Sequence, residues 1–342
     1  MLREKLATVV EGCDLDQISM AEAVGVIMEG VASDAQIAAF LTALRLKGET
    51  EEEIAGAVQA MRARCIKVPG AEIHAGAIDT CGTGGDGAGT VNVSTLAALT
   101  AAGAGATVAK HGNRAVSSRC GSADLLEALG VRIDVSPKVS ARCLDEAGFA
   151  FLFAPLYHPA MKAVVPVRRE MGIRTIFNIL GPLCNPAGVR RQLIGVYSQD
   201  LVQMIAAVLK RLGCEKGMVV ASEDGLDEIS VCASTTAALL SEDGKIQIMN
   251  IDPSSLGLNI HEPEAVRGGD PQENAVISME VLKGAKGPVR DAVQINAGAS
   301  LVVAGLASDL RDGIALSGKV LDSGKALDIL GKVKSITNEV QK

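Results

Sequence analysis

Two polar, glycine-rich segments contain the residues with the clearest chemical character. The first reads G-T-G-G-D-G-A-G-T-V-N-V-S-T from Gly82 to Thr95. Glycine admits a left-handed backbone and lets amide N–H groups approach a ligand closely. Asn92, Ser94 and Thr95 stand at the start of a predicted helix over 94–103, where unpaired N–H groups favour an anion. This segment therefore predicts a phosphate site.

The second segment reads K-H-G-N-R-A-V-S-S-R-C-G-S from Lys110 to Ser122. It adds three cations and several short polar donors, namely Lys110, Arg114, Arg119, Asn113, Ser117, Ser118 and Ser122. Neither segment has the Gly-Lys-Ser/Thr ending of a P-loop or the dinucleotide fingerprint. One such loop alone is often only a turn. Two of them, each after a short apolar run, predict a pocket for a ligand with more than one phosphate.

Two further groups of charged residues are candidates for binding. Asp227 and Glu228 are adjacent carboxylates in S-E-D-G-L-D-E-I-S, and such oxygens suit Mg²⁺. An acidic surface loop is the alternative interpretation. Arg168, Arg169 and Arg174 precede the turn at Gly181-Pro182. A guanidinium fork suits a carboxylate, whereas a solvated basic helix face is the alternative for Arg169.

Residues 1–70 read as short helices with apolar residues at helical spacing. Capping boxes are predicted at Ser19/Glu22, Ser33/Gln36 and Thr50/Glu53. Helices this short are marginal alone, so they must pack on one another or on a partner subunit. A small helical domain is therefore expected, with Val68-Pro69-Gly70 as the linker that ends it.

From residue 73 short apolar runs alternate with helical patterns, which predicts an α/β domain with a largely parallel sheet. Strands are expected at 77–80, 106–109, 133–135, 149–153, 194–196, 216–221 and 229–232. Helices are expected at 94–103, 122–129, 137–147, 200–212 and 323–334, with another opened by Pro159 and interrupted by Pro166. Both glycine-rich loops then fall at carboxyl ends of strands, where such sheets bind ligands.

Composition narrows the class of protein. The 342 residues are 48% hydrophobic but only 2% aromatic, with no Trp, so the core must be aliphatic. The net charge of −7 argues against a nucleic-acid partner. Eight cysteines without a C-x-x-C pair indicate reduced thiols in a cytoplasmic protein. The uncharged stretch 87–109 holds too many polar and glycine residues for a membrane helix.

The motifs D-T-C-G-T-G-G-D, N-V-S-T, K-H-G-N-R-A-V-S-S, G-S-A-D and L-E-A-L-G resemble the signature of the anthranilate phosphoribosyltransferase family. This family is grouped with pyrimidine nucleoside phosphorylases, and the resemblance covers nearly the whole chain. It implies a small N-terminal helical domain (1–70), joined by helices from about 160–180, hinged to a larger α/β domain (71–342) with a largely parallel sheet and flanking helices. A cytoplasmic homodimer formed through the helical domain is implied as well.

The same resemblance assigns site residues. For 5-phosphoribosyl 1-diphosphate it implies Gly82, Gly85, Asp86, Thr90, Asn92, Val93, Ser94, Thr95, Lys110, His111, Gly112, Asn113, Arg114, Ala115, Val116, Ser117, Ser118 and Ser122. For anthranilate it implies Gly82, Asn113 and Arg168. For Mg²⁺ it implies Ser94, Asp227 and Glu228, which favours the metal over the acidic-loop alternative.

The implied reaction moves a phosphoribosyl group onto the amino group of anthranilate, in tryptophan biosynthesis, and releases pyrophosphate. No residue is assigned as an obligate acid or base, because that amine is already neutral. His111 is a candidate for proton transfer and equally for a hydrogen-bonding wall of the pocket. The alternatives are a related phosphoribosyltransferase or nucleoside phosphorylase with another acceptor, and a non-catalytic nucleotide- or nucleic-acid-binding regulator.

Overall fold

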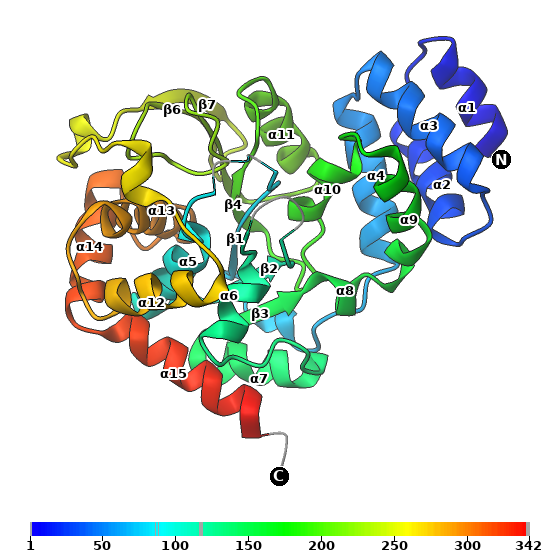
Figure 1. Cartoon of the computed structure of the whole chain (residues 1–342). Helices are drawn as coiled ribbons and strands as arrows, with labels where there is room; N and C mark the ends of the chain where they lie inside the picture. The colour runs from blue at the N-terminus through cyan, green and yellow to red at the C-terminus, as the bar shows by residue number, and fades with distance from the viewer. Residues whose placement is uncertain (1, 86, 88, 116–118, 340–342) are drawn as a thin grey trace.

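The N-terminal helices lie beside a larger unit built on one β-sheet, as Figure 1 shows. The computed structural model describes residues 2–85, 87, 89–115 and 119–339. The N-terminal helices are α1 (Leu2–Val10), α2 (Gln17–Met28), α3 (Asp34–Lys47) and α4 (Glu51–Ala63). The expected combination of a helical part and a larger α/β part is confirmed. The domain boundary at residue 70 stays a prediction.

Side-chain caps determine where these helices begin. The capping boxes at Ser33/Gln36 and Thr50/Glu53 are confirmed, each with both reciprocal bonds. The box at Ser19 is wrong, because α2 already begins at Gln17. Asp16 is the N-cap, and its Oδ1 accepts the backbone N–H of Ser19 at 2.6 Å. Asp is as good a cap as Ser, and the earlier residue leaves Ser19 inside the first turn.

One sheet with the strand order β3-β2-β1-β4-β5-β6-β7 is formed by the described residues. The strands are β1 (Ile78–Gly82), β2 (Val108–Gly112), β3 (Phe149–Phe153), β4 (Arg191–Gly195), β5 (Lys216–Ser222), β6 (Thr235–Leu240) and β7 (Ile246–Ile251). The first five pair in parallel, and β6 and β7 add antiparallel at one edge. The largely parallel sheet is thereby confirmed, whereas β6 and β7 were not expected.

Two of the predicted strands are wrong. Residues 133–135 and 229–232 are irregular, although Ile133, Ile229 and Val231 are buried in the core. The backbone of Ile229 pairs with a side chain instead of a strand: its N–H donates to Asn296 Oδ1 and its carbonyl accepts from Asn296 Nδ2. Burial makes a segment apolar whether it is a strand or an irregular loop, so hydrophobicity alone could not separate the two.

Helices cover both faces of the sheet. They are α5 (Val93–Gly103), α6 (Ser122–Ala128), α7 (Pro137–Ala147), α8 (Ala154–Tyr157), α9 (Val165–Met171), α10 (Phe177–Leu183), α11 (Asp200–Arg211), α12 (Pro271–Leu282), α13 (Pro288–Ala304), α14 (Leu310–Asp322) and α15 (Lys325–Asn338). Short 3₁₀ turns are η1 (Ala71–Ile73), η2 (Pro159–Ala163), η3 (Ser254–Leu256) and η4 (Pro263–Val266). Pro166 does not interrupt a helix but lies in the first turn of α9, where a missing N–H leaves no bond unmade. No helix in the described ranges is long and apolar enough to cross a membrane.

Alternation along the strands divides the core into two clusters. Met218 and Val220 of β5 pack with α5, α13 and α15, whereas Val219 and Ala221 point to the opposite face. That opposite face belongs to the same cluster as the N-terminal helices, α9, α10 and α11. Helices that are far apart in sequence therefore share one core, and the sheet carries both groups.

The strand order places a topological switch point between β1 and β4. From β1 the chain runs through α5 to β2 on one side, and from β4 it runs through α11 to β5 on the other. The connections leave in opposite directions, which opens a crevice outside the carboxyl ends of β1 and β4. Ligands of open parallel sheets bind at such a point.

Candidate active site

Asp227 lies in the crevice between the ends of β1 and β4. Its Oδ2 accepts the backbone N–H of Gly84 at 2.6 Å. A Cβ atom added to Gly82 would lie 2.3 Å from that oxygen, and one added to Gly195 would lie 1.5 Å from the backbone O of Asp227. Gly195 must therefore be glycine, and a side chain at Gly82 would displace the Asp227 carboxylate. Gly195 was missed by the sequence analysis, although it lies inside the predicted strand at 194–196 and ends the observed β4.

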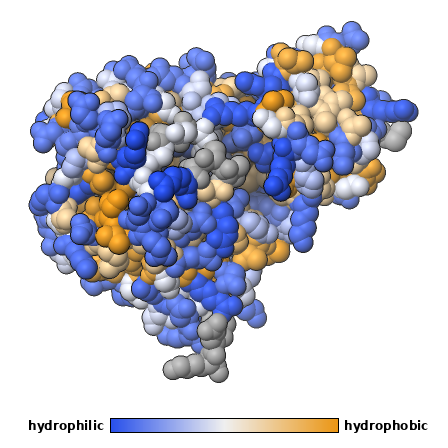
Figure 2. Space-filling view, in the orientation of Figure 1, coloured by the Kyte–Doolittle hydropathy of each residue, from blue (hydrophilic) through white to orange (hydrophobic). Residues whose placement is uncertain are grey.

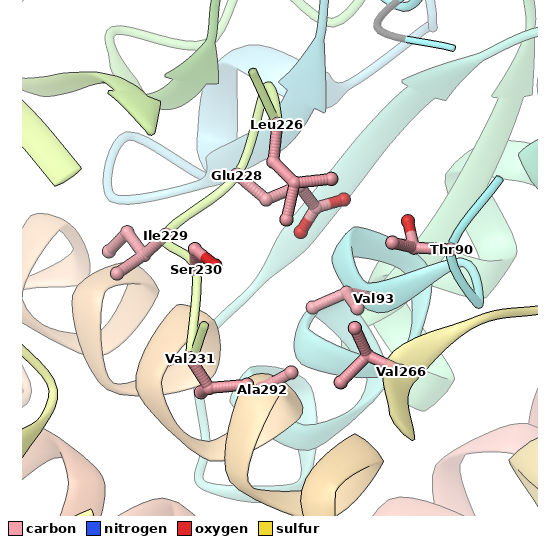
Figure 3. Close-up of a pocket in the computed structure, with 9 residues that line it drawn as sticks. All are labelled: Thr90, Val93, Leu226, Glu228, Ile229, Ser230, Val231, Val266 and Ala292. Atoms are coloured by element: carbon pink, nitrogen blue, oxygen red, sulfur yellow. The ribbon is translucent and has the colours of Figure 1, made fainter. Parts of the chain in front are cut away.

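Glu228 and Ser94 meet beside Asp227. The backbone N–H of Ser94 donates to Glu228 Oε1 at 3.1 Å, and Ser94 lies in the first turn of α5. Ser94, Asp227 and Glu228 line one small pocket. A second pocket adjoins it, and Figure 3 shows Glu228 reaching toward Thr90 and Val93 at the start of α5. The structure thus gathers the three predicted magnesium ligands.

Lys110 lies beneath this group and is only 1% exposed. Its Nζ donates to the carbonyl O of Thr80 at 2.5 Å and to Ser94 Oγ at 3.3 Å. Burial lowers the pKa of Lys110, while the nearby carboxylate of Asp79 opposes that shift. The ammonium group therefore holds Ser94 from below, and its contact with a phosphate stays a prediction.

Asp79 joins β1 and β2 below the two loops. Its Oδ1 accepts the backbone N–H of His111 at 3.1 Å, and its Oδ2 accepts from Asn185 Nδ2 at 2.7 Å. Asn185 Nδ2 also donates to the carbonyl of Ala109 at 2.7 Å. Burial raises the pKa of Asp79 to about 6. Asn185 was not singled out in the sequence, and only its position in N-P-A after a Gly-Pro turn could have drawn attention to it.

His111 is buried beside a second histidine. Its Nδ1 lies 3.2 Å from the carbonyl O of Gly181, and its ring centroid lies 5.1 Å from that of His158. Burial lowers the pKa of His111 to about 3 and that of His158 to about 4. Both rings are therefore neutral near pH 7. His158 was not recognised as a candidate, although it stands in the Y-H-P sequence before the arginines.

The second loop is folded by Asp124 of α6. Asp124 Oδ2 accepts the backbone N–H groups of Ala115 and Gly121 at 3.0 and 2.9 Å. Arg114 Nη1 donates to Asp124 and to Glu127 at 2.9 and 2.5 Å. Ser122 Oγ donates to the carbonyl of Asn113 at 3.2 Å. The guanidinium of Arg114 is thus engaged on α6, while Asn113 stays exposed.

Two arginines reach this region from α9 and the loop after it. The guanidinium of Arg168 lies 5.8 Å from the ring centroid of Phe177, and burial lowers its pKa. Phe177 is four residues before Gly181, so Arg168 and His111 contact α10 about one turn apart, roughly 6 Å along its axis. Arg174 donates to the carbonyl of Gly85 and lies 4.0 Å over the ring of Tyr197, which connects the first loop to the segment after β4.

Comparison with known proteins identifies the family. Models described as a glycosyl transferase family helical bundle domain and a/b domain match residues 3–65 and 74–327. The anthranilate phosphoribosyltransferase of Thermomicrobium roseum is 51% identical over 340 residues, which cover 99% of this chain and 97% of that protein. That of Moorella thermoacetica is 51% identical over 326 residues, covering 95% of each. The chain belongs to this family.

Solved structures agree with that assignment. Anthranilate phosphoribosyltransferase from Thermus thermophilus has a TM-score of 0.90 at 42% identity, with 97% of this chain and 98% of that chain covered. The enzyme from Saccharomyces cerevisiae, solved in complex with PRPP and Mg, has a TM-score of 0.89 at 29% identity, with 99% and 98% covered. The family resemblance seen in the sequence motifs is therefore confirmed, together with the fold.

Not every predicted site residue can be placed. Asp86, Val116, Ser117 and Ser118 lie outside the described residues. The other predicted residues lie on the two loops, on the adjoining ends of β1, β2, α5 and α6, on α9 or on the 227–228 turn. These residues are Gly82, Gly85, Thr90, Asn92, Val93, Ser94, Thr95, Lys110, His111, Gly112, Asn113, Arg114, Ala115, Ser122, Arg168, Asp227 and Glu228. Their roles in binding stay predictions.

The neutral state of His111 can be measured directly. We expect the Cε1–H signal of His111, assigned by its loss in His111→Gln, to stay unchanged between pH 8 and pH 5, because the folded pKa is about 3. In urea the same proton should titrate near an ordinary histidine pKa of about 6.5. Below that pH the unfolded chain binds a proton at His111 and the folded chain does not. The free energy of unfolding therefore decreases as the pH falls below that value. An inflection between pH 5 and pH 7 in the folded protein would contradict the assignment.

Proposed function

We propose that this chain transfers the phosphoribosyl group of 5-phosphoribosyl 1-diphosphate to the amino group of anthranilate, giving N-(5-phosphoribosyl)anthranilate and pyrophosphate in tryptophan biosynthesis. The observation that carries the proposal is the junction of Asp227 and Glu228 with the first loop and the start of α5, through Gly84 N and Ser94 N. Relatives named for this activity, about half identical over nearly the full length, support it.

The leaving pyrophosphate accumulates negative charge, and stabilising that charge is the main task. The glycine-rich loop carries backbone N–H groups beside the positive end of the α5 dipole, and two of these N–H groups, Gly84 and Ser94, already donate to Asp227 and Glu228. Donors fixed before the reaction need no reorganisation as charge develops. Arg114 pairs with Asp124 and Glu127, which shapes the loop, and its half-exposed guanidinium is proposed to contact the diphosphate as well.

The donor set at the crevice fits a magnesium ion. Ser94, Asp227 and Glu228 offer a hydroxyl and two carboxylates, which are hard oxygen ligands of the kind Mg²⁺ takes. When bound together with the diphosphate, Mg²⁺ supplies positive charge that neutralises the leaving group. Lys110, below Ser94, keeps that hydroxyl in place through its Nζ.

On the acceptor side, Arg168 and the neutral imidazole of His111 both lie against α10. We assign the carboxylate of anthranilate to Arg168, whose half-buried guanidinium makes no ion pair with another described residue. Asn113 and Gly82 complete the proposed anthranilate contacts. With a pKa of about 3, His111 is a weak base, so it is better suited to orient the amine than to remove its proton.

Turnover tests the function itself. With both substrates we expect anthranilate consumption and pyrophosphate release in equal amounts, only when Mg²⁺ is present. Glu228→Gln should abolish most of that activity because a neutral amide replaces a charged carboxylate ligand, whereas Glu223→Gln, on the exposed part of the same turn, should keep it. Consumption of another aromatic amine, or phosphorolysis of a nucleoside, in place of this reaction would move the assignment to a related enzyme of the same fold. Binding to oligonucleotides without turnover would favour a regulator.

Substitutions can distinguish the role of Arg168 from that of its neighbour Arg169. Arg168→Ala should raise the KM for anthranilate about tenfold to a hundredfold, the usual value of a charged hydrogen bond, with little change in the KM for the sugar diphosphate. Arg169→Ala is the matched control, because it removes an exposed arginine from the next position of α9. Equal effects on both KM values for Arg168→Ala would show that this arginine is structural or binds phosphate.

We also propose that the chain acts as a cytoplasmic homodimer joined through its N-terminal helices. Val10, Val31 and Leu46 are exposed there, and Leu46 is 83% exposed. Figure 2 shows apolar surface over this part of the molecule. The eight cysteines form no disulfide among the described residues, which supports a reducing compartment.

Oligomeric state checks this proposal. Sedimentation velocity should give the mass of a dimer for the wild type, and Leu46→Glu should shift the equilibrium to monomer because a charge would be buried in the interface. Leu306→Glu is the control, since Leu306 is exposed on the α/β part of the chain. A monomer at all concentrations in the wild type would remove the proposal.

A further inference from the structure

The segment 266–274 runs along the first loop, although it lies far away in sequence. The backbone N–H of Val91 donates to the carbonyl of Val266 at 3.1 Å, and that of Gly268 donates to the carbonyl of Gly89 at 2.8 Å. Thr90 and Arg267 form a β-bridge between these two bonds. Figure 3 shows Val266 beside Val93 at the base of the loop. The first loop is therefore paired over several residues with a distant strand-like segment.

Asn274 secures this pairing from inside. It is only 1% exposed, and the oxygen and the nitrogen of its side-chain amide bond to different segments. Its Oδ1 accepts the backbone N–H of Gly269 at 2.7 Å, and its Nδ2 donates to Asn92 Oδ1 at 3.2 Å. A Cβ at Gly268 would lie 2.7 Å from Asn274 Oδ1, so the backbone closes tightly over the amide.

Asn92 in turn contacts the second loop. Its Nδ2 donates to the carbonyl of Cys120 at 2.9 Å, and its Oδ1 also accepts from Cys120 Sγ at 3.2 Å. The side chain of Asn92 is thus bonded to protein on both sides. Arg119 and Glu273 add an ion pair of 3.6 Å at the surface, but both side chains are exposed and such a pair contributes little.

We propose that Asn274 is a positioning residue for the diphosphate end of the sugar substrate. By holding the amide of Asn92, it fixes the spacing of the two loops before the ligand binds. Glycine-rich loops lose much conformational freedom on binding, and a preset spacing removes part of that loss. The inference rests on the proposed function, in which both loops contact the diphosphate, and it adds a residue of α12 that touches no substrate.

The kinetic test uses Asn274→Asp. This change keeps the shape and the acceptor for Gly269, but it replaces the N–H donor to Asn92 with a second oxygen. We expect the KM for 5-phosphoribosyl 1-diphosphate to rise about tenfold, the usual effect of one buried hydrogen bond lost, while kcat and the KM for anthranilate change less than about twofold. Ser278→Ala is the matched control: it lies one turn later on α12, is equally buried, and its hydroxyl has no hydrogen-bond partner among the described residues.

A second measurement does not require turnover. Hydrogen–deuterium exchange of the amides at 89–96 and 119–124 should be faster by about tenfold in Asn274→Asp than in the wild type, and unchanged in Ser278→Ala, because a lost bond of this size changes local opening by that factor. If Asn274→Asp does not fold, both measurements are made on Asn274→Ser, whose side chain is too short to reach both Gly269 and Asn92.

The outcomes separate the two proposals. If the wild-type protein shows no turnover, the proposed function is wrong. The exchange rates alone then test whether Asn274 connects the two loops. Faster exchange together with a selective rise in the KM for the sugar diphosphate supports the inference. Unchanged exchange, unchanged KM values, an equal change in both KM values, or the same effects in Ser278→Ala would each overturn it.

Discussion

The close approach of Asp227 to the ends of β1 and β4 is the constraint on which the rest of the site depends. A parallel sheet opens where its connections diverge, and the 223–234 loop fills that opening. Its backbone at Asp227 leaves no room for a Cβ atom at Gly195, and the Asp227 carboxylate occupies the space beside Gly82. The same residue shapes the first loop through Gly84 N. It also fixes where Glu228 meets Ser94. The carboxylates therefore reach the phosphate loops because two strands end in glycine.

Beneath that contact lies a layer of buried polar groups. Asp79 and Lys110 are withdrawn from water, which raises the pKa of the first to about 6 and lowers that of the second. Burying charges is unfavourable unless each finds partners, and here Asn185, the backbone N–H of His111, the carbonyl of Thr80 and Ser94 Oγ supply them. Groups so fully bonded have little freedom to move. They form a fixed support on which the loops above can be set for an anionic ligand.

Short-range sequence patterns predicted the local structure well, and they failed where a competing cap or burial decided it. The boxes at Ser33 and Thr50 are set by bonds three residues apart, so their sequence pattern was sufficient. At Ser19 the same pattern was present, but Asp16 offered an equivalent cap earlier in the chain. The apolar residues at 229–232 resemble a strand because the segment is buried, while Asn296 takes its backbone bonds. The edge strands β6 and β7 went unrecognised in a stretch with little periodic signal.

The sequence by itself determined the family, the two glycine-rich loops, the acidic pair and the alternation of strands with helices. These features depend on residue type and short spacing. Only the tertiary structure decided what each side chain does. Lys110 and Arg114 look like phosphate ligands in the sequence, and that role stays a prediction. The structure adds that Lys110 donates to Ser94 Oγ and that Arg114 donates to Asp124 of α6. Asn92 is bonded to Cys120, 28 residues away, and to Asn274, 182 residues away. Such partners are chosen by the packing of the whole chain, which no local pattern encodes.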